Sequence, residues 1–226
     1  MEREKIERQI REVYSTLMYG LLKLDKRIRA LEAGGGGGGG RTPRFELCYS
    51  TSSESGSFMI PQNGTYMVLC ATSYGQTHTV NIPSGATVID TQSTDLGNGR
   101  GLEITIAMFS SGDTVSISQT WGNWPGRVFA VIRLDNIIVG NNYDFEAIGD
   151  AATTVTIQGG SKHLVVGVAM GRTFRNDTIL QNAAMILTGN WGNDSACAIY
   201  LTDKTETYSF YGYDGGLSGI GAWNVT

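Results

Sequence analysis

The chain has 226 residues, with 17 Lys and Arg against 21 Asp and Glu, and a formal net charge of −4 at pH 7. Hydrophobic residues make up 41% of it, enough for a packed core, so global disorder is excluded. The acidic balance argues against nucleic-acid binding, which needs a positive field. No apolar run approaches the roughly 20 residues of a membrane span, and the charged N-terminal segment lacks the apolar core of a signal peptide. We therefore expect assembly in the cytoplasm and no membrane insertion.

Residues 1–33 predict a coiled-coil helix that serves as a stalk. Apolar side chains recur there in alternating steps of four and three residues, which is the heptad spacing. An isolated helix cannot bury its single apolar stripe, so partner helices are needed. The alternative is an amphipathic helix that packs on its own β domain. The heptad core consists of Ile10, Tyr14, Leu17, Leu21, Leu24, Ile28 and Leu31.

The segment 27–32 resembles the trimer-specifying coiled-coil motif, Arg-apolar-x-x-apolar-Glu. Arg27 and Glu32 occupy the g and e positions, where side chains pair between helices. The Arg27 guanidinium can form a bidentate bond with Glu32 of a neighbouring helix, and its methylene stem can cover the adjacent core layer. The motif implies a homotrimer in which Arg27 and Glu32 join the heptad core as oligomerisation residues.

Residues 34–44 predict a linker. Seven consecutive glycines, 34–40, disfavour helix and end the stalk at Ala33. Two interpretations remain open: a flexible tether, or a bundle of extended polyproline-II-like segments, one from each chain.

From residue 45 onward the pattern is mainly β. Short runs rich in Val, Ile, Thr and Tyr alternate with Gly, Asn, Asp and Ser, which predicts an antiparallel sandwich or jelly roll. We expect two tandem lobes of this kind, 45–135 and 136–226. The predicted strands are 45–49, 64–72, 78–82, 87–91, 102–109, 114–119, 127–134, 153–158, 163–170, 183–188, 196–202, 207–213 and 220–226.

An internal repeat supports the two lobes. Four pairs of apolar segments follow one another in the same order: 64–72 with 161–169, 102–109 with 196–201, 114–118 with 207–211, and 127–132 with 219–224. In the first lobe, residues 58–66 and the Gly-Asp turn in 109–115 resemble the compact trimeric jelly rolls of the complement and tumour-necrosis-factor class.

Catalytic and metal-binding motifs are not found, so we expect no enzymatic activity, no cofactor and no metal site. His78 and His163 are the only imidazoles, and His163 lies in an apolar strand. Asp203 and Glu206 form a candidate pair of carboxylates for glycoside hydrolysis, but their position before a strand favours solvated turn residues. The cysteines are odd in number and lack metal-binding spacing, which predicts buried free thiols at Cys48, Cys70 and Cys197.

Tryptophans in polar loops are the better candidates for a binding site. Trp faces beside amides and carboxylates suit sugar rings, through stacking and hydrogen bonds. The alternative is that these tryptophans cap the cores or line a subunit interface. The candidate ligand-binding residues are Asn123, Trp124, Asn190, Trp191 and Asp194.

A coiled coil, a glycine joint and a β head form a layout that resembles the head and tail fibres of tailed bacteriophages. This resemblance implies a structural virion protein assembled in the host cytoplasm, which docks on other virion proteins through its N-terminal region and attaches to the host through a surface glycan. Two alternatives remain: a capsid or tail decoration protein without receptor binding, and a β-sandwich polysaccharide hydrolase.

Overall fold

The computed structural model describes residues 42–53, 55–72, 78–97, 100–119, 127–149, 151–170, 183–190, 194–211 and 216–226. The predicted stalk and the glycine run lie outside these residues. Within them the chain is mainly antiparallel β structure and contains no helix, and hence none that could cross a membrane. Residues Pro43–Thr226 form one compact unit.

The described part of this unit contains fifteen strands. Those of the first half are β1 (Arg44–Thr51), β2 (Ser55–Met59), β3 (Gly64–Thr72), β4 (His78–Asn81), β5 (Thr87–Asp95), β6 (Gly101–Phe109), β7 (Thr114–Gln119) and β8 (Arg127–Asp135). Those of the second half are β9 (Val139–Gly149), β10 (Ala152–Ile157), β11 (Lys162–Met170), β12 (Met185–Asn190), β13 (Asp194–Thr202), β14 (Glu206–Tyr211) and β15 (Leu217–Val225).

The two halves share one sheet topology. The five-stranded sheet of the first half has the order β1-β8-β3-β6-β5, and that of the second half has the order β9-β15-β11-β13-β12. The smaller sheets are β2-β7-β4 and β10-β14. Each pair of segments that the sequence predicted as repeated occupies matching positions: β3 and β11, β6 and β13, β7 and β14, β8 and β15.

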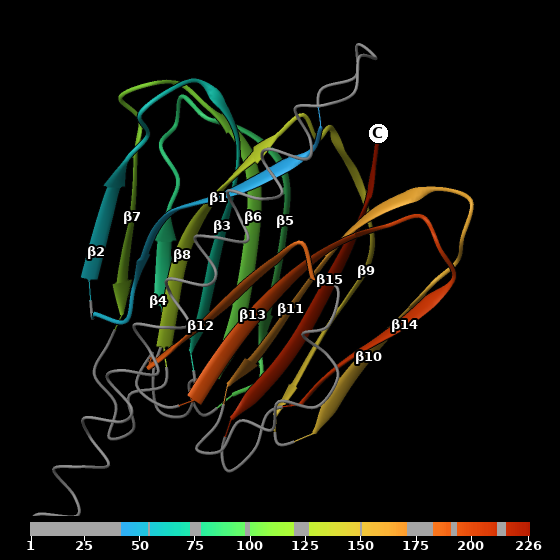
Figure 1. Ribbon diagram of the computed structural model, residues 1–226. Helices are drawn as coiled ribbons and strands as arrows, with labels where there is room; N and C mark the ends of the chain where they lie inside the picture. The colour runs from blue at the N-terminus through green and yellow to red at the C-terminus, as the bar shows by residue number, and fades with distance from the viewer. Residues whose placement is uncertain are drawn as a thin grey trace, which may run out of the picture. The chain divides into compact units, whose positions relative to one another are not determined.

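The sheets stack as four layers, with the smaller sheets outermost (Figure 1). The largest cluster of buried apolar side chains lies between the two five-stranded sheets, and a further cluster lies under each smaller sheet. The inner strands are therefore covered on both faces, which explains why β3, β6 and β11 are almost continuously apolar. By contrast, β10 is buried at every second residue.

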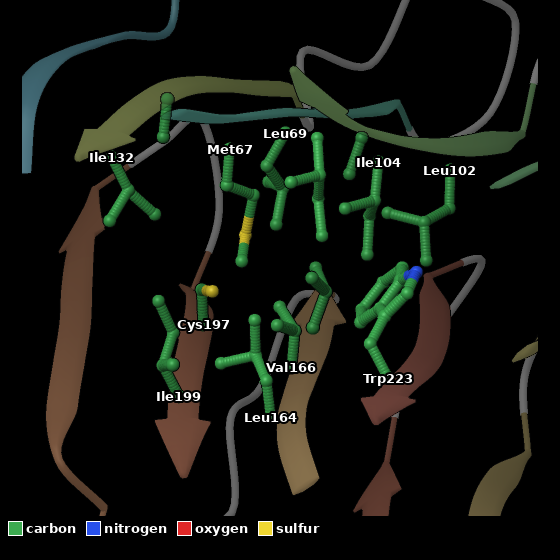
Figure 2. Close-up of a cluster of buried hydrophobic side chains, with 14 of the residues drawn as sticks. Met67, Leu69, Leu102, Ile104, Ile132, Leu164, Val166, Cys197, Ile199 and Trp223 are labelled. Carbon is green, nitrogen blue, oxygen red and sulfur yellow. The ribbon is translucent and has the colours of Figure 1, made fainter. Parts of the chain in front are cut away.

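The halves face each other like the subunits of a symmetric dimer. In Figure 2, Ile132 of β8 lies across the core from Ile199 of β13, near one edge of the two facing sheets. Leu102 of β6 lies across the core from Trp223 of β15, near the other edge. Since β13 is the counterpart of β6, and β15 of β8, each half offers the same face to the other. The two halves therefore share one core.

Every strand predicted from the sequence is present, but two strands were missed. β9 lies between the predicted strands 127–134 and 153–158, where no strand was expected, and the link between β8 and β9 is only residues 136–138. The sequence of β9 reads as a loop because Gly140, Asn141 and Asn142 are turn formers. It is held as an edge strand by pairing with β15, with register shifts at Trp223. β2 is short and rich in Ser and Gly, and it is also an edge strand.

Candidate functional site

The strands of the compact unit run between two opposite ends, the junction end and the loop end. At the junction end, where the chain arrives from the predicted stalk, Arg44 pairs with Asp135. Thr226 lies at the same end, because its backbone exchanges two hydrogen bonds with Ile138, of 3.0 and 3.1 Å. At the opposite end, here called the loop end, Thr72 pairs with both Gly101 and Arg127.

The loop ends of both halves lie on the same side of the unit. Gly219, near the start of β15, faces Leu102, near the start of β6, so closely that a Cβ on Gly219 would overlap the Leu102 side chain. Gly149 pairs with Leu217, and a Cβ on Gly149 would overlap the guanidinium of Arg100. The strand ends that flank the loops of the two halves therefore lie on the same side of the unit.

The structure shows where the tryptophan loops begin and end. Asn123, Trp124 and Trp191 lie outside the described residues. The loop with Trp124 joins β7 to β8 and starts beside His78, which pairs with Gln119. The loop with Trp191 joins β12 to β13, where the backbones of Asn190 and Asp194 pair directly. Both loops leave from the loop end, since Ser195 pairs with Met170 at the last residue of β11.

A polar network lies at the base of the loop end in the first half. The Oγ1 of Thr72 lies 3.3 Å from Nδ1 of His78, and Nε2 of His78 lies 3.5 Å from Oε2 of Glu103. The other carboxylate oxygen of Glu103 accepts a hydrogen bond of 3.5 Å from Thr105. The His78 and Glu103 side chains are only 12% and 21% exposed. Gly101 makes room for the ring, because a Cβ there would lie 3.2 Å from Cε1 of His78.

The tautomer of the His78 ring decides whether Nδ1 donates to the Thr72 hydroxyl or accepts from it, and the Glu103 carboxylate faces Nε2 on the other side of the ring. Thr72 and His78 are the residues on either side of the loop 73–77, so their contact closes the base of that loop. Sequence analysis left His78 isolated. The available signal was Glu103, a charged residue inside the otherwise apolar strand β6.

The carboxylate pair considered for hydrolysis lies at the junction end instead. The Glu206 carboxylate accepts hydrogen bonds from the Tyr208 hydroxyl and, at 3.3 Å, from Thr202. The backbone carbonyl of Asp203 accepts from Gly160 at 3.2 Å. Burial, followed by the hydrogen bond to Glu206, raises the pKa of Tyr208 to about 12. Glu206 is therefore engaged in ordering the turn between β13 and β14.

The remaining candidate side chains are structural. His163 is 2% exposed, and its ring contacts Tyr143 edge to face with centroids 4.7 Å apart. All three cysteines are free; Cys70 and Cys197 are buried as expected, whereas Cys48 is only half-buried. Among the residues that the structure describes, no three His, Cys, Asp or Glu side chains gather to hold a metal ion.

Comparisons with protein-family models, curated proteins and solved structures find no match to this chain.

Proposed function

We propose that the protein is a homotrimeric virion fibre or appendage protein that exposes a β head for binding to a host-surface glycan. One observation carries this proposal: the chain joins the compact unit at Arg44, and the loops with Trp124 and Trp191 leave from the opposite end. A stalk of residues 1–33 anchored to other virion proteins would thus present these loops outward. Assembly in the host cytoplasm follows from the same proposal.

In this proposal the head consists of two jelly-roll-like lobes, 45–135 and 136–226. A jelly roll places eight strands in two sheets through two Greek keys. The strand order of the first half supports this assignment, since β1-β8-β3-β6 lie in one sheet and β2-β7-β4 in another, while β5 joins the larger sheet beside β6. The second half repeats the larger sheet strand for strand.

The loops are suited to binding because the strands that carry them are rigid. Thr72, the last residue of β3, is fully buried, and so are Val128 in β8 and Ala196 in β13. Such a scaffold can hold loops in place while their sequences vary. Indole faces stack on sugar rings, and the neighbouring Asn and Asp side chains can hydrogen-bond sugar hydroxyls. Three copies on one fibre would multiply a weak single-site affinity by avidity.

The test is attachment to host cells by Trp124→Ala and Trp191→Ala chains, measured beside a thermal melt of each. We expect unchanged melting and a loss of attachment of tenfold or more for at least one variant. Tyr143→Phe is the control: Tyr143 lies on β9, outside these loops, and the variant keeps the ring that contacts His163, so it should attach like the parent chain.

Three outcomes would contradict the proposal. Normal melting with full attachment of both variants would exclude a tryptophan site. Binding of the parent chain to virus particles but not to host cells would indicate a decoration protein. Release of reducing sugar from capsule or cell-wall polysaccharide by the pure chain would indicate a hydrolase.

A further inference from the structure

Four of the exposed apolar side chains of the described residues belong to residues toward the junction end. Ile138 is 71% exposed, Met59 66%, Met108 50% and Val88 49%. Met108 lies in the strand row that runs from Thr65 to Leu134 and Phe45, next to Arg44. Val88 lies one row further in, opposite Ala107. Met59 pairs with Thr114, just after the turn that follows β6.

Ile138 lies in the link between β8 and β9, residues 136–138, here called the ledge, and its backbone is held in place. Its backbone NH donates to Thr226 over 3.1 Å, and the NH of Thr226 donates back over 3.0 Å. The residues on both sides, Ile137 and Val139, are 5% and 6% exposed and belong to the central core. Asn136 has a φ of 58°, a left-handed conformation that turns the chain after β8. A fixed backbone therefore presents a branched apolar side chain to the outside.

We propose that this ledge and Met108 contact a second copy of the same chain, so that the heads of the trimer touch one another at the junction end. This inference rests on the proposed coiled-coil trimer. Arg44 pairs with Asp135, and Ile138 follows three residues later, so the ledge lies beside the point where the predicted stalk joins the head. Copies that a coiled coil holds in parallel meet at this end first.

The chemistry of the ledge suits such a contact. Ile138 loses little conformational entropy on burial because its backbone is already fixed, and β branching limits its rotamers. Met108 can adapt its shape to a neighbour because it is unbranched and flexible. A small contact suffices between tethered copies, since the linker converts association into an intramolecular step at high effective concentration.

The test is disulfide cross-linking of the full chain with a cysteine in place of Ile138. The chain carries Cys48→Ser, so the native thiols interfere little, because Cys70 and Cys197 are buried. Ser93→Cys is the matched control, as Ser93 is exposed on β5 opposite Glu103, toward the loop end. We expect Ile138→Cys to form covalent dimers under mild oxidation, at least tenfold more than Ser93→Cys and independently of protein concentration. Light scattering on the same samples gives the number of chains per particle.

The two proposals fail in distinguishable ways. A particle of three chains in which Ile138→Cys and Ser93→Cys cross-link equally, or not at all, overturns the contact at the ledge and leaves the fibre proposal standing. A particle of one chain overturns both. A second variant, Ile138→Asp, should keep the mass of three chains and lower the melting temperature of the head by several degrees; an unchanged melting temperature contradicts the contact.

Discussion

The indole nitrogen of Trp223 donates a hydrogen bond of 2.6 Å to Oδ2 of Asp90 and thereby ties β15 of the second half to β5 of the first. Trp223 is fully buried in the central core. The Asp90 carboxylate also accepts from Nε2 of Gln92, at 3.0 and 3.1 Å. A directional bond between two otherwise apolar faces aligns them, which non-directional hydrophobic contact cannot do.

Asp90→Ala should destabilise the head by about 1–3 kcal/mol, because the buried indole NH loses its acceptor. Glu146→Ala is the control, as it removes a carboxylate that is exposed on the edge strand β9. Urea unfolding of both variants measures the difference. Equal midpoints for the two variants would show that the bond between the halves contributes nothing to stability.

A ring against a glycine defines the packing of the outer sheet in the second half. The ring of Phe210 in β14 occupies the space that a Cβ on Gly167 in β11 would take. Gly167→Ala should therefore destabilise the fold by about 1–3 kcal/mol, as overpacked cores do. Gly85→Ala is the matched control: the nearest atom to its new Cβ, an oxygen of Asp113, lies 3.9 Å away. Thermal melts that rank the two variants in the opposite order would contradict this packing.

The sequence was informative wherever burial is periodic or continuous. Strands such as β3 and β7 were predicted with their observed bounds, because apolar β-branched runs end at clear turn residues. β9 was missed because an edge strand takes its pairing from a neighbour, and Asn141 and Asn142 fit a turn equally well. The contact between the halves could not be predicted, because the almost continuous apolar runs of β3, β6 and β11 indicate burial on both faces but not which sheet covers each face.

The candidate site was predictable only in part. Aromatic residues flanked by Asn and Gly mark Trp124 and Trp191 as loop residues, but not the end of the molecule at which those loops lie. The end at which a loop lies depends on the register of the strands beside it, such as the pairing of His78 with Gln119. Likewise, the contact of His78 with Glu103 joins strands that are not neighbours in the chain, so spacing alone could not reveal it.

Thiol labelling should distinguish the cysteines. Burial raises the pKa of Cys197 to about 12, and Cys70 is also buried, so neither thiol should react in the native protein. Cys48 is half-buried, and burial followed by the nearby Glu46 carboxylate raises its pKa. We expect slow labelling of Cys48 alone, faster at higher pH, and labelling of all three thiols after unfolding; Cys48→Ser removes the native signal. Rapid native labelling of Cys197 would contradict the shared core.

Two phenols, the buried Tyr200 and the half-buried Tyr208, should make the head sensitive to alkali. Burial is the main cause that raises the pKa of both Tyr200 and Tyr208 to about 12, above an ordinary value of 10.0. Below pH 10 both groups are protonated in the folded and unfolded states, so they add no pH dependence. Between pH 10 and 12 the unfolded chain releases these protons first, and the free energy of unfolding falls as pH rises.

Tyr208→Phe should start less stable, because it loses the bond to Glu206, but its stability should fall less steeply over this window. Urea unfolding at pH 9, 10, 11 and 12 gives these slopes, and identical slopes for Tyr208→Phe and the parent would show that the Tyr208 phenol ionises as freely in the folded head as in the unfolded chain.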